Sequence, residues 1–522
     1  MSKTLKSIAG MSLGTLFSRL TGFVKWAVLG AVLGFTPLAD AYNLAHVLPT
    51  MVYELILGGI LSAVFIPVIV EQLSEHEPKQ AWLNISQVIN AGLLVMAATT
   101  LICFAASPFL VYIQTLKAQT ATREQVLFFF WFFIPQIFFY GLSAISGGVL
   151  NARNKFVAVA YAPVANNLVV VATLFAYKLF PWFGPAGLAI GTTFGVLAQV
   201  LILLPSLKSC GFKYHFTVNF KHPAVVKTFK LSLPVILYVA FNQLNLTVQN
   251  NLAIGIQGGV SALQYAFAFY ILPHGLLAVS IGTVLLPGLS HLAVKKEWES
   301  FAGAVRKGIS WSALCIIPSM AVLITCSFPI VQSLMQHGRF HAADSIMLAR
   351  VLSLYSLGLF SFTLYLFLNR VFYSLQDTKT PMILNLIGNA FNSGFNLLVI
   401  GKLGVDGLAL GHAAAYTLIA LLSLWLIRSR VREIKLSLLL PVFLKTAAAS
   451  VLVGLLGWGM SLGWQRWVDG GHLGPKIFYL AAMMLGLGAA YLGLARLFRI
   501  AELMEMFKML RPAGTNQGKT NL

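Results

Sequence analysis

The stretch Phe17-Ser-Arg-Leu-Thr-Gly-Phe-Val-Lys25 lies inside the first long apolar run of the chain, and Ala39-Asp40-Ala41 opens the second. Even lenient insertion scales place an Arg, Lys or Asp at mid-membrane at about +2.5 to +3.5 kcal/mol each. A chain that keeps Arg19, Lys25 and Asp40 there is expected to turn them toward a water-filled cavity and a polar ligand. The alternative is that Arg19 or Lys25 lies near a helix end and reaches the headgroups; we favour the cavity.

The same stretch returns later in the chain, together with other segments in the same order. The pairs are Phe17-Ser-Arg-Leu with Phe241-Asn-Gln-Leu, Leu48-Pro49 with Leu272-Pro273, and Gly187-Leu-Ala-Ile-Gly191 with Gly407-Leu-Ala-Leu-Gly411. Each match alone could arise by chance in a Leu-rich chain, but the shared order and near-constant offset favour a duplication. Each copy holds six predicted spans, an even number, so the repeats should be parallel with the substrate site at their interface.

Composition places the chain in the membrane. It has 522 residues, of which 58% are hydrophobic and 10% charged, and its mean hydropathy is +0.82. Apolar runs near the roughly 20 residues that cross a bilayer as a helix recur throughout. We therefore predict an all-α polytopic membrane protein with about fourteen transmembrane helices, arranged as two parallel six-helix lobes plus two C-terminal helices.

The domain organisation follows from the repeat and from composition. The predicted parts are an N-terminal six-helix lobe (1–206), a cytoplasmic interfacial linker (207–230), a C-terminal six-helix lobe (231–430), transmembrane helices 13 and 14 with an amphipathic tail (431–511), and a disordered tail (512–522). The linker is basic with interspersed aromatic residues. Residues 498–511 read either as an interfacial amphipathic helix or as a solvated tail.

The distribution of charge predicts orientation and excludes one class of partner. Lys and Arg gather in alternate loops, such as residues 208–230 and 428–435. The net charge of +21 is therefore attributed to cytoplasmic loops beside anionic lipid and not to nucleic-acid binding. This asymmetry predicts that both termini are cytoplasmic.

Motifs for catalysis, nucleotide binding and metal binding are missing from the sequence. There is no G-x-x-x-x-G-K-[ST] loop and no G-x-S-x-G elbow. The four cysteines, Cys103, Cys210, Cys315 and Cys326, form no C-x-x-C pair. We expect a protein that is not an enzyme, with no metal or cofactor.

Polar residues inside the predicted spans concentrate in the first two helices of each lobe. In the second lobe they include Asn242, Gln243 and Gln264. Gln243 and Gln264 are the counterparts of Arg19 and Asp40, so the cations of the cavity should lie on the N-terminal lobe. For any single Asn or Gln, hydrogen bonding between helices is the competing role.

At these residues the sequence resembles a known family. Phe17-Ser-Arg-Leu-Thr-Gly-Phe and Ala39-Asp40-Ala-Tyr look like the MurJ/MviN lipid II flippases, as does Arg370-Val-Phe-Tyr-Ser-Leu-Gln-Asp-Thr-Lys-Thr-Pro381, followed by Gly404-Val-Asp-Gly-Leu-Ala-Leu-Gly411. The resemblance, over about residues 5–430, implies membership of the multidrug/oligosaccharidyl-lipid/polysaccharide exporter superfamily. It also implies a central cationic cavity, a lipid groove formed with helices 13 and 14, and a location in the bacterial cytoplasmic (inner) membrane.

The resemblance carries over residue by residue. Arg19 matches the essential arginine of the family's first helix, Lys25 falls where a second arginine is usual, and Asp40 matches the acidic residue. Ser18 and Ser261 match small polar cavity positions. Two departures stand out, because the family's basic pair in the second helix aligns with Tyr53-Glu54, and its arginine near the helix-8 proline aligns with Ala268.

The resemblance implies a flippase that moves undecaprenyl-pyrophosphate-linked peptidoglycan precursor (lipid II) outward by alternating access. Arg19 and Lys25 would attract the pyrophosphate, and Asp40 would pair with one of them in the empty state. A flippase for another polyprenyl-linked glycan, a drug/cation antiporter of the same superfamily, and a scaffold for envelope-synthesis proteins are the alternatives. The expected partners are the lipid-linked precursor and membrane lipids, with cell-wall synthesis and division proteins as further candidates. Membrane potential and ion countertransport both remain open as the driving force.

Overall fold

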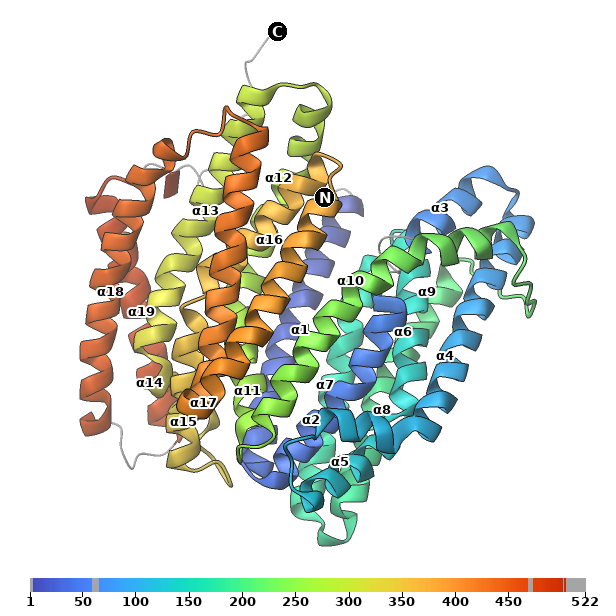
Figure 1. Ribbon diagram of the computed structural model, residues 1–522, viewed down its shortest axis with the longest axis horizontal. Coiled ribbons are helices and arrows are strands. Elements are labelled where there is room, and N and C mark those ends of the chain that lie inside the picture. The colour runs from blue at the N-terminus through green and yellow to red at the C-terminus, as the bar shows by residue number, and fades with distance from the viewer. Residues whose placement is uncertain (1–2, 59–64, 468–472, 501, 504–522) are drawn as a thin grey trace. The chain divides into compact units, whose positions relative to one another are not determined.

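The computed structural model describes residues 3–58, 65–467, 473–500 and 502–503, and the regular structure in these ranges is helical (Figure 1). Helices are the expected outcome, because a membrane-spanning backbone must satisfy its N–H and C=O groups within its own segment. The predicted all-α class is confirmed.

The helices of the first repeat run from α1 to α9. Their bounds are α1 Lys3–Leu33, α2 Pro37–Tyr53, the π-helical turn η1 Glu54–Gly58, α3 Ile66–Glu75, α4 Pro78–Gln114, α5 Thr120–Phe133, α6 Pro135–Ala152, α7 Phe156–Leu179, the short 3-10 turn η3 Pro181–Phe183, α8 Gly184–Leu201 and α9 Leu204–Ser209.

The remaining helices run from α10 to α19. Their bounds are α10 Pro223–Ala253, α11 Gly259–Pro273, the π-helical turn η4 His274–Ala278, α12 Val279–Val294, α13 Trp298–Thr325, α14 Ser327–Met335, α15 Ala342–Ser356, α16 Leu359–Ser374, α17 Lys379–Arg430, the 3-10 turn η5 Leu436–Leu439, α18 Leu440–Trp467 and α19 Leu473–Leu497.

Many of these helices are long and apolar enough to cross a membrane. Nine such helices occur in the described residues, or up to eleven if each of two bent pairs is one span. The bent pairs are α5 with α6 and α15 with α16, which turn by 43° and 45°. The chain is therefore a multi-pass membrane protein, and the count of fourteen spans stays a prediction.

Local structure repeats along the chain at a constant offset. Helices α1 and α10 have the same length, and the π-helical turns η1 and η4 also match in length. The shift in numbering from α1 to α10 is the same as the shift from η1 to η4. Gly184 and Gly404 are related by this same shift, and both have φ of +55°, a conformation that glycine adopts at little cost. Because backbone irregularities recur with the regular helices, the structure supports a duplication. Its shift is the one between Gly187 and Gly407, and it differs from the shift that pairs Arg19 with Gln243 and Asp40 with Gln264, so those two pairings do not follow the structural repeat.

The two π-helical turns lie near prolines. Pro273 directly precedes η4, and Pro49 lies one helical turn before η1. A proline inside a helix removes an N–H donor and clashes with the preceding turn, so the chain next to it departs readily from α geometry. The second helix of each repeat is thus interrupted at the same place.

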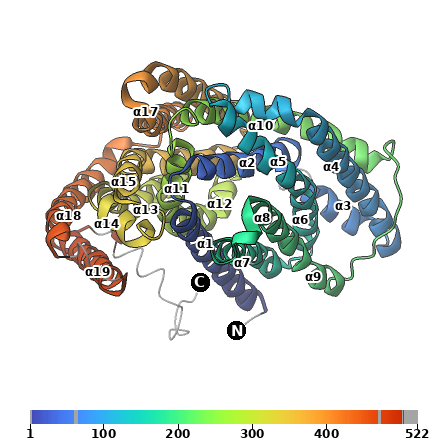
Figure 2. The ribbon, with the colours of Figure 1, turned by 90° about the horizontal axis from the view of Figure 1, so that it is seen from below.

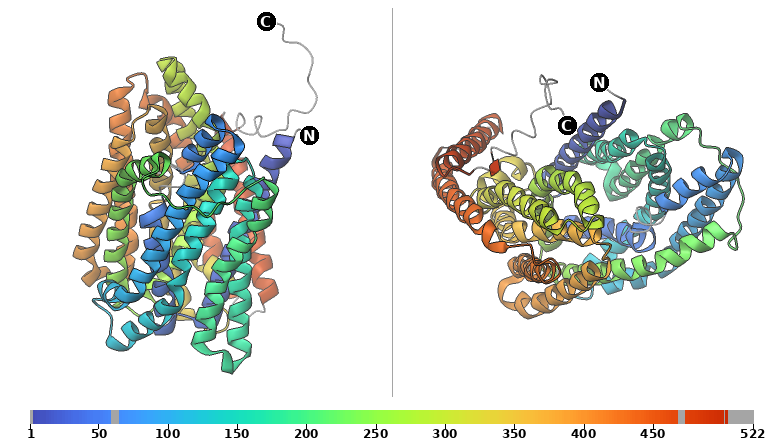
Figure 3. Two further views of the ribbon diagram at one scale, coloured as in Figure 1. Left: turned by 90° about the vertical axis from the view of Figure 1, so that its right-hand side faces the viewer. Right: turned by 90° about the horizontal axis from the view of Figure 1, so that it is seen from above.

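The helices form two compact units. The first contains Met1–Ala268, Met335–Ser345 and Ser393–Leu408, and the rest of the chain forms the second. In the first unit α7 packs between α1 and α8 (Figure 2). In the second unit α13 packs against α12, α16 and α18, and α18 also packs against α19 (Figure 3).

This division into units is not the same as the predicted lobes. Helix α10 and residues 259–268 of α11 belong to the first unit together with residues 1–206. The lobes describe repeats in the sequence and stay a prediction. The predicted amphipathic helix 498–511 is described only at residues 498–500 and 502–503, and the predicted disordered tail 512–522 lies outside the described residues.

Helices α18 and α19 expose large apolar side chains. Leu455, Phe478 and Leu485 are 58%, 70% and 75% exposed. Patches of this kind are costly in water but are stable against lipid tails.

Candidate functional site

The two cations of the first span lie on α1, at least two helical turns from either end of that helix. Arg19 is exposed, whereas Lys25 is partly buried, with its Nζ 4.7 Å from the centroid of the Trp26 ring. Six residues of α-helix separate them by about 9 Å along the axis and about 120° around it. Arg19 and Lys25 therefore point in different directions. Ser18, beside Arg19, is partly buried, and its carbonyl accepts from Asn167 Nδ2 at 3.3 Å.

Asp40 lies near the start of α2 and is only 2% exposed. One of its carboxylate oxygens accepts the N–H of Gly258 at 2.6 Å. The other accepts the N–H of Ser261 at 2.9 Å and the hydroxyl of Ser261 at 2.7 Å. Gly258 directly precedes α11 and Ser261 is its third residue, so Asp40 caps the N-terminus of a helix far along the chain. The positive end of the helix dipole favours an anion at this position.

Gly258 is the residue that allows this approach. Its φ is +76°, and a Cβ at this position would overlap the ring of Phe35. Any other residue would be strained here, because L side chains rarely adopt such a φ.

Further polar side chains extend the contact between α2 and α11. Asn43 donates from Nδ2 to the hydroxyls of Ser261 at 2.9 Å and Tyr265 at 3.3 Å. Gln264 donates to the carbonyl of Asn43 at 3.2 Å. We call Asp40, Asn43, Ser261, Gln264 and Tyr265 the Asp40 cluster.

The sequence predicts that Asp40 pairs with Arg19 or Lys25. In the structure its carboxylate has other partners. The hydrogen bonds described for the Asp40 carboxylate come from Gly258 and Ser261. Lys25 is linked to the cluster only indirectly, because the Trp26 ring beside it lies 5.4 Å from the ring of Tyr265.

The remaining candidates lie on α10. Gln243 donates from Nε2 to Glu54 Oε2 at 3.0 Å, which joins α10 to the π-helical turn η1. Asn242 is partly buried. Tyr53, next to Glu54, lies 5.7 Å from the ring of Tyr140. Glu54 thus accepts a hydrogen bond from the Gln243 amide, and Tyr53 packs against the ring of Tyr140.

The structure brings Asp40, Ser261 and Gln264 together and places Gln243 at a separate contact. Sequence reasoning did not single out Asn43, Gly258 or Tyr265 as site residues. Asn43 carried a signal as a polar residue in an apolar span. Gly258 and Tyr265 carried none, because their role depends on residues of α2, a helix far earlier in the sequence.

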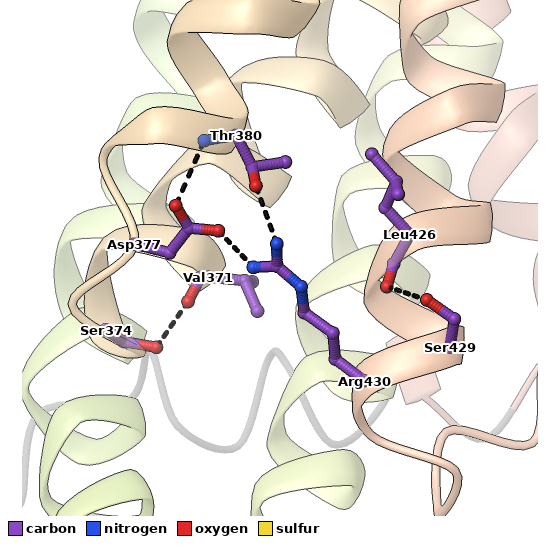
Figure 4. Close-up of polar contacts among 7 residues, drawn as sticks. All are labelled: Val371, Ser374, Asp377, Thr380, Leu426, Ser429 and Arg430. Carbon is purple, nitrogen blue, oxygen red and sulfur yellow. Dashed lines mark hydrogen bonds and ion pairs between the residues drawn. The ribbon is translucent and has the colours of Figure 1, made fainter.

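The motif Arg370–Pro381 forms a second polar contact, in the second unit (Figure 4). Asp377 precedes α17 and accepts the N–H of Thr380 at 3.0 Å. Arg430, at the other end of α17, pairs with Asp377 and donates to the Thr380 hydroxyl at 2.7 Å. Partial burial raises the pKa of the Asp377 carboxyl, but hydrogen bonds from Thr380 and Arg430 outweigh it and lower that pKa to about 2.

An apolar cleft lies between α18 and α19. Its volume is about 550 Å³, and Leu455, Gly459, Met460, Tyr479 and Met483 contribute to its lining. Trp464 closes one side of it and donates from Nε1 to Gln332 at 2.7 Å.

Within the part of the chain that the structure describes, no group of three or more His, Cys, Asp or Glu side chains is placed to hold a metal ion.

Comparison with known proteins places these features in a family. The sequence pattern of the family described as lipid II flippase MurJ matches residues 29–476. The chain belongs to the MurJ family. The MurJ match spans both repeats; it begins after the Phe17–Phe23 motif and ends in the first residues of α19.

Individual relatives agree with the family match. The chain is 29% identical over 514 residues to a "Probable lipid II flippase MurJ" of Vibrio cholerae, covering 95% of this chain and 97% of that protein. It is 27% identical over 509 residues to a "Lipid II flippase MurJ" of Burkholderia cenocepacia, covering 94% and 96%.

Solved structures also match this chain. The structure titled "Lipid II flippase MurJ, inward closed conformation" matches with a TM-score of 0.76 at 25% identity, covering 94% of this chain and 99% of that chain. An inward-facing multidrug resistance transporter of the MATE family matches with a TM-score of 0.67 at 14% identity. The second likeness shows a shared fold alone.

Proposed function

We propose that this chain is a flippase that moves lipid II from the inner to the outer leaflet of the bacterial cytoplasmic membrane. The observation that carries the proposal is the pair of cations, Arg19 and Lys25, inside the first apolar helix of a chain of the MurJ family. A charge inside a membrane span is costly unless it serves a polar ligand or a water-filled path. A pyrophosphate is such a ligand, and charge-assisted hydrogen bonds to it are strong.

In this mechanism the headgroup of the precursor enters the protein and its prenyl tail stays in lipid. Arg19 is exposed and can meet the pyrophosphate first. Lys25 follows about 9 Å further along the helix axis. The apolar cleft between α18 and α19 is of suitable chemistry for the tail, because its named lining includes Leu455, Met460 and Met483.

Alternating access then requires contacts that can separate without unfolding a helix. The Asp40 cluster is of this kind, since it joins two helices end to side through hydrogen bonds. We propose that these bonds hold one conformation and break in the other. An inside-negative potential favours outward movement of an anion by about 2.3 kcal/mol per charge per 100 mV. Potential alone and ion countertransport are both compatible with this arrangement.

The departures from the family pattern bear on the identity of the substrate. Tyr53, Glu54 and Ala268 stand where the family places cations, so Arg19 and Lys25 would hold the diphosphate almost alone. A flippase for another polyprenyl-linked glycan is therefore the second candidate. A cation antiporter is disfavoured, because such a transporter needs a net acidic binding site.

The orientation in the membrane is part of the same proposal. Both termini would be cytoplasmic, with the basic loops beside anionic lipid. The precursor and membrane lipids are the proposed partners, and cell-wall synthesis and division proteins are candidates through their shared use of the precursor.

Depletion followed by analysis of lipid-linked intermediates tests the proposal. We expect lipid II to accumulate on the inner leaflet and wall growth to stop. Restoring the wild-type chain should reverse both effects, and Arg19→Ala should not. Intact wall synthesis with accumulation of a different lipid-linked glycan would contradict the lipid II assignment.

A further inference from the structure

The segment between α9 and α10 is a stretch of chain without regular secondary structure. Residues 212–221, which we call the strap, belong to no helix. Figure 3 shows them as a trace that leaves α9 and returns to the start of α10. A segment of this length between two helices normally needs contacts elsewhere to adopt one conformation.

Helix α4 supplies those contacts through two polar side chains. Asn90 donates from Nδ2 to the carbonyls of His215 at 2.9 Å and Thr217 at 2.8 Å. Its Oδ1 accepts the hydroxyl of Tyr214 at 2.7 Å. Ser86 Oγ accepts the N–H of His215 at 3.1 Å. The backbone of the strap is therefore fixed against α4.

Apolar packing holds the strap at both ends. The ring of Phe212 lies 5.3 Å from the ring of Trp82 on α4, edge to face. Cys210 before the strap and Ala224 and Val225 after it are buried in a hydrophobic cluster that also contains Trp82. The strap thus has one defined face against the protein.

The opposite face is a row of apolar side chains. Phe216, Val218 and Phe220 are 84%, 40% and 52% exposed. Tyr214 is 49% exposed as well, but its hydroxyl bonds to Asn90 of α4, so it is not part of this row. Large aromatic side chains held in such exposure by a fixed backbone indicate a surface that contacts something apolar.

The ionisable side chains of the strap and its immediate flanks are basic. Lys208, Lys213 and Lys221 are exposed, and residues 204–222 contain no Asp or Glu. The nearby Lys227 forms an ion pair with Glu71 at 2.6 Å, so its charge is already neutralised. Exposed aromatic residues with lysines at the end of a membrane span are typical of the boundary between lipid headgroups and acyl chains. The apolar span Pro181–Ser209 ends shortly before the strap.

The second repeat shows that this arrangement is not a general feature of the fold. The link after its last helix, residues 431–439, buries Val431, Ile434 and Leu439 at 3%, 0% and 6% exposure. The same link exposes Leu438 at 57%, but it has no exposed aromatic row like that of the strap.

We propose that the strap is a binding surface for anionic phospholipid. Its aromatic row enters the boundary between headgroups and acyl chains, and Lys208, Lys213 and Lys221 face the phosphates. Asn90 and Ser86 hold the strap in the geometry that presents this row. A second copy of the chain is a poorer occupant, because it would bring three like charges to the same surface. The proposal does not depend on which substrate the protein moves.

Photocrosslinking at two positions of the strap tests this surface. Benzoylphenylalanine would replace Phe216, which points outward, or Phe212, which packs against Trp82 as a matched control. The purified full chain would be placed in nanodiscs of phosphatidylcholine, with and without phosphatidylglycerol. We expect at least about five-fold more lipid adducts at position 216 than at position 212, and more adducts with phosphatidylglycerol present.

The lysines are tested by a triple variant in the same assay. Lys208→Gln, Lys213→Gln and Lys221→Gln together should reduce the enrichment by phosphatidylglycerol to about one, while adducts in phosphatidylcholine persist.

A charge-matched control removes lysines elsewhere on the chain. Lys178→Gln, Lys402→Gln and Lys476→Gln together should keep the full enrichment. Adducts with protein in place of lipid at position 216 would overturn the proposal. Equal lipid yields at positions 216 and 212, or equal yields with and without phosphatidylglycerol, would overturn it as well.

Discussion

Asp40 and Asp377 both accept N–H groups at the start of a helix, but they reach that position by different routes. Asp377 caps α17 from two residues before it. Asp40 caps α11 from a different helix, 218 residues before Gly258 and 221 before Ser261. The first contact forms whenever its own helix forms. The second exists only when α2 and α11 are packed together, so it can report on, and control, their separation.

The two carboxylates also differ in solvent exposure and in the charge of their partners. The Asp377 side chain is 17% exposed and pairs with Arg430, whose side chain is 41% exposed. Asp40 is 2% exposed and is held by neutral donors. An exposed ion pair contributes about 0–1 kcal/mol because water screens it. A buried carboxylate depends on each of its hydrogen bonds. We infer that Asp377 is a local support and that Asp40 is a conformational contact.

The largest effect is expected for Asp40→Ala. It leaves three buried donors on Gly258 and Ser261 without their acceptor, at a cost of roughly 1–3 kcal/mol for each. Transport by the reconstituted protein should fall by about ten-fold or more. Asp40→Asn keeps one acceptor oxygen but turns an N–H₂ group toward a donor of Gly258 or Ser261. This variant should fold, but its transport should be impaired. Full activity of both variants would contradict the inferred role.

An intermediate effect is expected for Ser261→Ala. The hydroxyl bond to Asp40 and the bond from Asn43 are lost, while both N–H bonds remain. A loss of roughly 0.5–1.5 kcal/mol corresponds to a change of about two- to ten-fold in transport. Ser261→Thr keeps the hydroxyl and serves as the control. A larger defect than that of Asp40→Ala would show that Ser261 acts by another route.

A smaller effect is expected for Arg430→Gln. Because the pair is partly exposed, unfolding stability in detergent should drop by about 1 kcal/mol or less, and transport should stay within about two-fold. Arg428→Gln, two residues earlier on the same helix, is the matched control. If Arg430→Gln abolished transport in a folded protein, the contrast between the two carboxylates would be lost.

The smallest effect concerns pH. The pKa of Asp377 is lowered from its ordinary value near 3.8 to about 2. Its charge therefore stabilises the folded state fully above about pH 4, and this contribution is lost as the pH falls toward 2. The stability difference between wild type and Asp377→Asn should be constant from neutral pH down to about pH 4 and shrink below it. A difference that grows on acidification would contradict this assignment.

The sequence predicted regular features of the fold better than tertiary contacts. Long apolar runs were sufficient to predict an all-α membrane protein, because membrane helices are determined locally. The short matches indicated a duplication, but their offsets differ, so they did not fix the register between the two repeats. The π-helical turns were not predicted, since Pro49 and Pro273 indicate a disturbance but not its geometry. The composition of residues 207–230 predicted a basic interfacial linker with aromatic residues. The conformation of the strap could not be predicted, because it depends on Asn90 and Ser86 of a helix far away in the sequence.

The candidate site was also predicted only in part, because its contacts join residues that are far apart in the sequence. Charge in an apolar run identified Arg19, Lys25 and Asp40, and the resemblance identified Ser261. The partners of Asp40 could not be read from the sequence, since the cap is formed in trans by Gly258 and Ser261. The expected pairing with a cation followed from charge alone, which ignores the donors that a helix N-terminus supplies.

A flipping assay with the purified chain and lipid II in proteoliposomes tests the central claim most directly. With an inside-negative potential imposed, wild-type protein should move lipid II to the outer leaflet. Arg19→Ala should lower the initial rate by about ten-fold or more, because the anion loses its exposed cation. Lys25→Arg should keep the rate within about two-fold, because the charge is retained. Undiminished transport by a folded Arg19→Ala protein would contradict the claim that this cation binds the diphosphate.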